Sequence, residues 1–192
     1  MPPTAASIAS VNKALRRFRR NRRGSSAVEF ALVAPIFLAL LFAIIETAIV
    51  FFAGQVLETV TQDSARMVQT GQAQAANYDA GNFKKLVVCT HPLVNLLFDC
   101  MNGVYVDVQS YSAFSSVAIT EPIDAAKNFT GNMKYCPGKD GDIVVVRLFY
   151  KWPLFVTGLG YNIANLSGSK RLLSATAAFK NEPFPTGVST CS

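Results

Sequence analysis

The feature that most constrains this chain is an apolar stretch from Phe30 to Ala53, interrupted only by Pro35, Glu46 and Thr47. As a helix these 24 residues would extend about 36 Å, whereas the hydrocarbon core of a bilayer is roughly 30 Å thick. The stretch is longer than the apolar core of a secretory signal peptide, and no Ala-x-Ala cleavage site follows it. We therefore expect residues 25–54 to form a transmembrane helix that stays attached to the chain.

The positive charge is confined to one short arm. Residues 1–24 contain seven basic residues and no acid, while the remaining residues contain 11 basic and 12 acidic side chains. A basic arm directly before an apolar span is typical of a signal that keeps the N-terminus in the cytoplasm. We expect residues 1–24 to be a basic cytoplasmic leader, disordered over 1–12, and residues 72–192 to lie outside the cytoplasm. A nucleic-acid or lipid contact by residues 13–23 is a second interpretation of the arm, with a strong salt dependence as its signature.

All four cysteines follow the apolar stretch, as expected for two disulfide bonds in an exported domain. Three pairings are possible, and we favour Cys89 with Cys100 and Cys136 with Cys191. Pro92 supports the first pair, because an unbroken helix would hold its partners roughly 16 Å apart. A zinc site is not expected, since His91 is the only histidine and no Cys-x-x-Cys pair exists.

The outer part of the chain predicts a helix followed by strands. Residues 55–71 have the spacing of an amphipathic helix that ends at Gly71, with an apolar face at Leu57, Val60, Ser64, Ala65 and Val68. A short helix is expected from Phe83 to Cys89, continuing towards Leu97. Strands are predicted at Val104–Gln109, Asp142–Lys151 and Leu172–Phe179, the second of them central because its apolar run is continuous. The predicted fold class is α+β, a long N-terminal transmembrane-to-amphipathic helix packed on a small antiparallel sheet.

The residues between the arm and the apolar stretch are the most informative for function. Arg-Arg-Gly-Ser-Ser-Ala-Val-Glu-Phe-Ala-Leu-Val, residues 22–33, resembles the start of TadE-like pseudopilins of the tight-adherence (Flp-type) branch of type IV pilus systems. The family pattern is a basic leader, a glycine, and a glutamate at the fifth mature position, which Gly24 and Glu29 match. The resemblance is strong over 22–70 and weaker over 71–170, and it departs at Thr47 and at Asp63-Ser64.

The resemblance implies a function as well as a pilin-like fold. A prepilin peptidase would cut after Gly24, so that Ser25 becomes the first residue of a pseudopilin or minor pilin. Glu29 would then pair with the amino group of a neighbouring subunit, which offsets the cost of a carboxylate in an apolar environment. The implied partners are the peptidase, other pilin subunits, an inner-membrane assembly platform and the lipid bilayer, with no nucleic acid. The implied location is the bacterial inner membrane, with the C-terminal domain in the periplasm.

No pattern for an enzyme or a cofactor is found. There is no Gly-x-Ser-x-Gly motif and no phosphate-binding glycine loop, and Lys139-Asp140-Gly141-Asp142 is interpreted as a turn before a strand rather than a calcium site. Glu46 is a second acid in the apolar stretch, expected either to contact a partner subunit or to reach the outer headgroups. The alternative function is an unprocessed single-pass membrane protein whose outer domain binds a partner.

Overall fold

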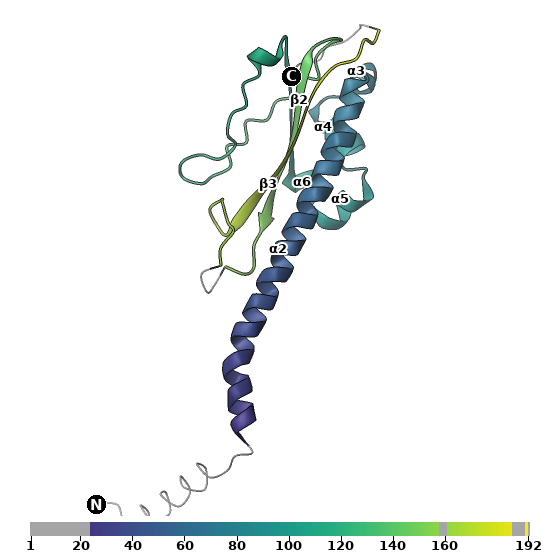
Figure 1. Cartoon of the computed structure of the whole chain (residues 1–192). Helices are drawn as coiled ribbons and strands as arrows, with labels where there is room; N and C mark the ends of the chain where they lie inside the picture. Colours follow the sequence, from purple (N-terminus) through teal and green to yellow (C-terminus); the bar gives the residue numbers. More distant parts are fainter. Residues whose placement is uncertain (1–23, 158–160, 186–190, 192) are drawn as a thin grey trace, which may run out of the picture. The chain divides into compact units, whose positions relative to one another are not determined.

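The structure, a computed structural model, describes residues 24–157, 161–185 and Cys191 (Figure 1). The basic arm at 13–23 and the segment 1–12, expected to be disordered, lie outside the described residues. The chain divides between Ile44 and Ile45 into two compact units. Helix α2, Ser25–Gln69, supplies the described helical part of the first unit and continues into the second.

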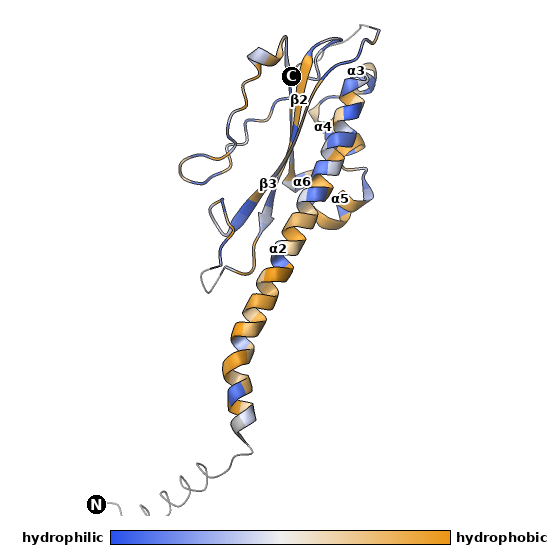
Figure 2. Cartoon of the chain, viewed as in Figure 1, coloured by the Kyte–Doolittle hydropathy of each residue, from blue (hydrophilic) through white to orange (hydrophobic). Residues whose placement is uncertain are grey.

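The first unit is helical because its residues favour helix and no internal residue ends it. Residues 25–44 are mostly Ala, Leu, Val, Ile and Phe, and Pro35 lies inside the helix without terminating it. Pro35 has no N–H to donate and leaves the carbonyl of Ala31 without its usual helical partner. Figure 2 shows that apolar residues cover most of this segment, with polar residues close to its start.

The second unit packs the later part of α2 against a sheet. The predicted face of Leu57, Val60, Ser64, Ala65 and Val68 is confirmed, because each of these side chains is buried. The helix ends at Gln69, whose carbonyl accepts the Glu182 N–H at 2.9 Å, and Gly71 follows with a φ of 77°. The end of α2 is therefore bonded to the segment that follows the last strand.

The sheet has three antiparallel strands in the order β1-β2-β3, which confirms the predicted α+β class. The strands are β1 Val104–Tyr111, β2 Ile143–Pro153 and β3 Lys170–Lys180, each longer than its predicted bounds by one to three residues in total. Val106 pairs with Leu148, and Leu148 pairs with Ala175. These residues share a main core with Val56 and Val60 of α2.

The opposite face of the sheet has a smaller core. Phe149, Leu166 and Leu172 form it, with Tyr105 and Phe129 packed against them. Phe129 and Leu166 belong to the two long connections between strands, so these connections cover part of that face. Both cores are needed to bury β2, which is buried on both sides over residues 143–149.

Short helical segments join α2 to β1. They are α3 Gln72–Ala75, α4 Ala80–Phe83, the π-helix η2 Lys84–Val88, α5 Pro92–Leu97 and α6 Cys100–Gly103, and a 3₁₀ turn, η3 Phe114–Ser116, follows β1. The predicted continuation of one helix from Phe83 towards Leu97 is wrong. The helical conformation stops at Val88 and resumes at Pro92, and His91 is extended because proline disfavours helical conformation in the residue before it.

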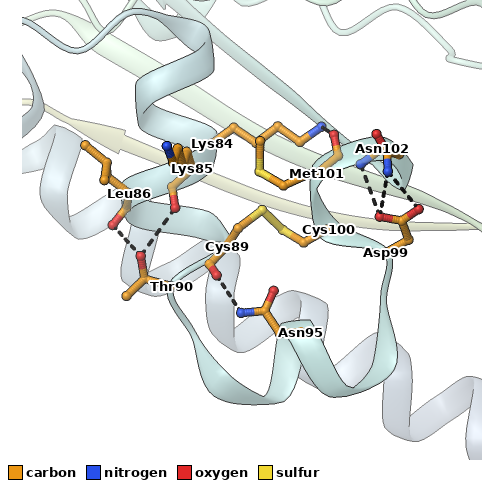
Figure 3. Close-up of a disulfide and its surroundings, with 10 residues drawn as sticks. All are labelled: Lys84, Lys85, Leu86, Cys89, Thr90, Asn95, Asp99, Cys100, Met101 and Asn102. Carbon is orange, nitrogen blue, oxygen red and sulfur yellow. Dashed lines mark hydrogen bonds between the residues drawn. A yellow bond between two sulfur atoms is a disulfide. The ribbon is translucent and has the colours of Figure 1, made fainter.

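The break in helical conformation between Val88 and Pro92 allows the first disulfide bond. Cys89 and Cys100 are bonded with their Cα atoms 5.7 Å apart, and Figure 3 shows the Asn95 amide donating to the Cys89 carbonyl at 2.7 Å. The Lys84 ammonium donates to the Met101 carbonyl at 2.8 Å, and its burial lowers the pKa of Lys84. The second disulfide joins Cys136 to Cys191, so both bonds follow the pairing that the sequence favours.

Gly71 and Gly54 should respond to alanine in opposite directions. At Gly71 an added Cβ would lie 2.5 Å from Cγ of Phe184, and the left-handed backbone itself disfavours alanine by about 1–2 kcal/mol. At Gly54, inside α2, an added Cβ meets no atom within 4 Å. We expect Gly71→Ala to lower the free energy of unfolding by at least about 1–2 kcal/mol, and Gly54→Ala to raise it by about 0.5–1 kcal/mol.

The measurement is denaturant unfolding of the full chain in detergent micelles, followed by circular dichroism. Equal midpoints for the two variants would contradict the described conformation of the α2 end.

Candidate functional site

Gly24 and Ser25 lie at the first turn of α2. Gly24 is exposed, and a Cβ added to it would meet no atom within 4 Å. The helix begins at Ser25, so the bond between these two residues lies at the helix start, where backbone N–H groups have no intrahelical acceptor. No described residue covers Gly24, and space for a Cβ is open there.

Glu29 lies one turn beyond Ser25 on the helix surface. Its side chain is exposed and its neighbours Val28 and Phe30 are exposed apolar residues, at 61% and 73%. Four residues of helix rise by about 6 Å, so a free amino group at Ser25 would reach the level of this carboxylate on an adjacent parallel helix displaced by about that distance along the axis. The arrangement presents one acid within an apolar surface at the start of α2.

The apolar surface around Glu29 continues along α2. Eleven large apolar side chains of the first unit are exposed: Val28, Phe30, Leu32, Val33, Ile36, Phe37, Leu38, Leu40, Leu41, Phe42 and Ile44. A helix that is apolar all round is covered by other protein or by lipid. By length and composition α2 can cross a membrane, and the large apolar side chains of its first part are exposed. These properties fit a single-pass membrane protein.

Glu46 lies in the second unit and is bonded within its own chain. It is only 7% exposed, and its carboxylate accepts the backbone N–H of Phe155 at 2.5 Å and that of Val156 at 3.1 Å. The next residue, Thr47, shares a hydrogen bond with the Tyr161 hydroxyl. Neither sequence interpretation of Glu46 included this contact. The only signal in the sequence was a carboxylate in an apolar run, which indicates a need for a partner without naming it.

A buried ion pair holds the long β1–β2 connection on the sheet, and sequence reasoning missed it. Arg147 of β2 donates to Asp107 of β1 through Nη2 at 2.6 Å and Nε at 2.9 Å. The other Asp107 oxygen accepts the Lys134 N–H, and Arg147 Nη1 donates to the Thr120 carbonyl. All of these partners belong to the sheet or its connection, so the pair has a structural role.

The remaining ionisable groups of the second unit form no reactive cluster. Within residues 24–157, 161–185 and Cys191, no three His, Cys, Asp or Glu side chains are grouped as a metal site requires. Tyr135 is buried against the Phe83 ring, and this burial raises the pKa of Tyr135. Asp142 caps the turn before β2 by accepting the Lys139 N–H at 3.0 Å.

The comparison with known families concerns α2. Residues 24–66 match the model of the family described as TadE, TadE-like protein. The resemblance inferred from the sequence is confirmed over this segment, which contains Gly24, Ser25, Glu29 and Glu46, and it indicates a role related to the Tad pilus. No curated protein matches the chain, and no solved structure matches it.

The contact of Glu46 with the β2–β3 connection generates a prediction. Glu46→Ala leaves the Phe155 and Val156 N–H groups without their acceptor, at a cost of about 1–3 kcal/mol. We expect amide hydrogen exchange at these two residues to accelerate by roughly 5- to 150-fold in Glu46→Ala. Glu46→Gln, which keeps a carbonyl acceptor, should show a smaller change.

Glu58→Ala is the matched control, because Glu58 also lies on α2 but bonds only to the Gln62 side chain in a solvent-exposed pair. Unchanged exchange at Phe155 and Val156 in Glu46→Ala would show that the carboxylate does not hold this connection.

Proposed function

We propose that this TadE-like chain is a pseudopilin or minor pilin that a prepilin peptidase processes after Gly24 for assembly of a tight-adherence (Flp-type) pilus. The observation that carries the proposal is the register at the start of α2. The basic arm, Gly24 and Glu29 stand in the order and spacing of the family, and residues 24–66 match the family model. The family is typically structural rather than enzymatic.

Charge and apolar length support an orientation for the chain. The seven basic residues of 1–24 favour retention of the N-terminus in the cytoplasm, and α2 is long enough to cross the bilayer. The Gly24–Ser25 bond would then lie at the cytoplasmic face of the inner membrane. The sheet and its disulfide bonds would lie in the periplasm, where disulfides form and persist.

The proposed role of Glu29 follows from electrostatics in apolar surroundings. An uncompensated carboxylate is costly among lipid chains or packed apolar helices. Cleavage before Ser25 creates an amino group at the same end of α2, and the amine of one subunit can neutralise the Glu29 carboxylate of the next. Because the first unit exposes apolar side chains around this pair, helices of neighbouring subunits can pack on it once they leave the lipid.

The first test is the intact mass of the full chain from cells with and without the prepilin peptidase. We expect loss of residues 1–24 only where the peptidase is present. Gly24→Leu should block the loss, since the added side chain meets the peptidase rather than this fold. Asn21→Leu makes the same kind of change three residues upstream and keeps every basic residue, so it should still be cut.

An unchanged mass, in cells that do cut a known prepilin, would reject processing. The alternative function, an unprocessed single-pass membrane protein with a partner-binding outer domain, would then be favoured.

The second test addresses the pairing of Glu29. Carbodiimide treatment of cells that assemble the pilus should join the Glu29 carboxylate to the amino-terminal residue of another processed pilin subunit, because the reagent couples carboxylates to adjacent amines. Peptide mass mapping identifies the product. Glu29→Gln should abolish it, while Asp63→Asn, a change at an exposed acid elsewhere on α2, should not.

The coupled product should also be absent when Gly24→Leu prevents cleavage. Full coupling in Glu29→Gln would reject the proposed pairing while leaving processing intact.

A further inference from the structure

We propose that Phe155, shortly after the end of β2, is a second membrane contact and inserts into the outer leaflet of the anionic phospholipid bilayer that α2 spans. The proposal rests on α2 spanning the membrane, which is part of the proposed function. Its partner is the lipid surface, and it concerns only residues of the second unit.

Phe155 has an unusual combination of a fixed backbone and an exposed ring. Its side chain is 84% exposed, more than any other large apolar side chain of the described residues. Its N–H donates to the Glu46 carboxylate, and the preceding residue, Leu154, is buried and donates its own N–H to the Ser169 carbonyl at 3.0 Å. The backbone N–H groups from Leu154 to Val156 bond to other parts of the fold, while the Phe155 ring stays exposed. Leaving such an apolar ring in water is unfavourable, because burial of apolar surface is stabilising.

Because Glu46 accepts the Phe155 N–H, Phe155 lies beside α2 at the position of Glu46. The 20 residues from Ser26 to Ile45 rise about 30 Å as a helix, which equals the thickness of a hydrocarbon core. Glu46 follows directly, at the level where a span of this length would meet the outer headgroups. Ile49 and Phe52 of α2 are still exposed beyond Glu46, at 44% and 53%. Phe155 thus adds to an apolar surface that α2 itself continues.

The same end of the sheet carries the residue types that favour a membrane interface. The register pairs Trp152 with Arg171 and Pro153 with Lys170, so both basic residues lie opposite the end of β2 that leads to Phe155. Lys170 is exposed, and Arg171 is half-buried with Nη1 donating to the Ile163 carbonyl at 2.8 Å. Aromatic rings at the headgroup level and basic side chains near anionic lipid are both stabilising. This combination favours a lipid surface as the occupant.

The chain contains a matched control for Phe155. Phe114 is also highly exposed, at 63%, but it follows the end of β1. Tyr111 at that end pairs with Ile143, the first residue of β2, so Phe114 lies at the opposite end of the sheet from Pro153. A tryptophan at position 114 therefore reports on an exposed aromatic ring that lies away from the proposed membrane contact.

Trp152 is the only tryptophan, which permits a single-reporter experiment. The full chain carrying Trp152→Phe with Phe155→Trp, or Trp152→Phe with Phe114→Trp, is placed in nanodiscs of phosphatidylcholine and phosphatidylglycerol. Quenching is measured with lipids brominated in their acyl chains and with aqueous iodide. We expect the tryptophan introduced at position 155 to lose most of its emission to the bromolipid and to resist iodide, with a blue-shifted maximum. The tryptophan introduced at position 114 should show the opposite pattern.

Four outcomes would overturn the proposal. Iodide quenching at position 155 equal to that at 114 would show that the ring stays in water. Protection from both quenchers would indicate a protein, such as a second copy of this chain, as the occupant. Failure of the chain to incorporate into nanodiscs would reject the proposed membrane span of α2, on which this proposal rests. Incorporation without bromolipid quenching would reject only the contact at Phe155 and leave the proposed function standing.

Discussion

The structure depends on one helix that meets two different environments. Up to Ile44 the surface of α2 is apolar and largely exposed, whereas from Val50 onward an apolar stripe of α2 is buried in the main core with the sheet. Burying that stripe requires a partner with small side chains at the contact, and β3 provides Ala175 and Ala177. The order of the sheet follows from the same requirement, because β2 is the most apolar strand and takes the central position, where both faces are covered.

Polar groups inside this arrangement are bonded to segments that would otherwise be weakly held. Asp107 and Arg147 bind the β1–β2 connection, and Asn181 donates to the carbonyls of Pro137 and Lys139 near the other end of that connection. The Cys136–Cys191 disulfide lies beside this contact along the chain. Buried polar groups need such partners, since an unsatisfied group costs about 1–3 kcal/mol. The connections are therefore ordered by hydrogen bonds and disulfides more than by apolar burial.

Much of this fold could be predicted from residue patterns, but the contacts that hold the connections could not. Apolar length located the first part of α2, periodicity located the face containing Leu57, and alternation or a continuous apolar run located the three strands. Each of these signals is local to one element. The bounds of the strands shifted by one to two residues at every end except the start of β1, because pairing with a neighbouring strand decides them. The pairing of Asp107 with Arg147 depends on a register between residues 40 apart, which no local pattern contains. The start of α2 was predicted from a family resemblance, since no fold contact distinguishes Gly24.

The bond between Glu46 and Phe155 also has a consequence for biogenesis. The two residues are 109 positions apart, so at roughly 5–20 residues per second Glu46 is synthesised on the order of 5–20 s before its partner exists. During that interval the Glu46 carboxylate has no native donors, because Phe155 and Val156 have not yet been synthesised. Water, lipid headgroups or a chaperone must solvate it until β2 has been completed. Glu46 therefore reaches its final environment only when the residues after β2 have folded back onto this part of the helix.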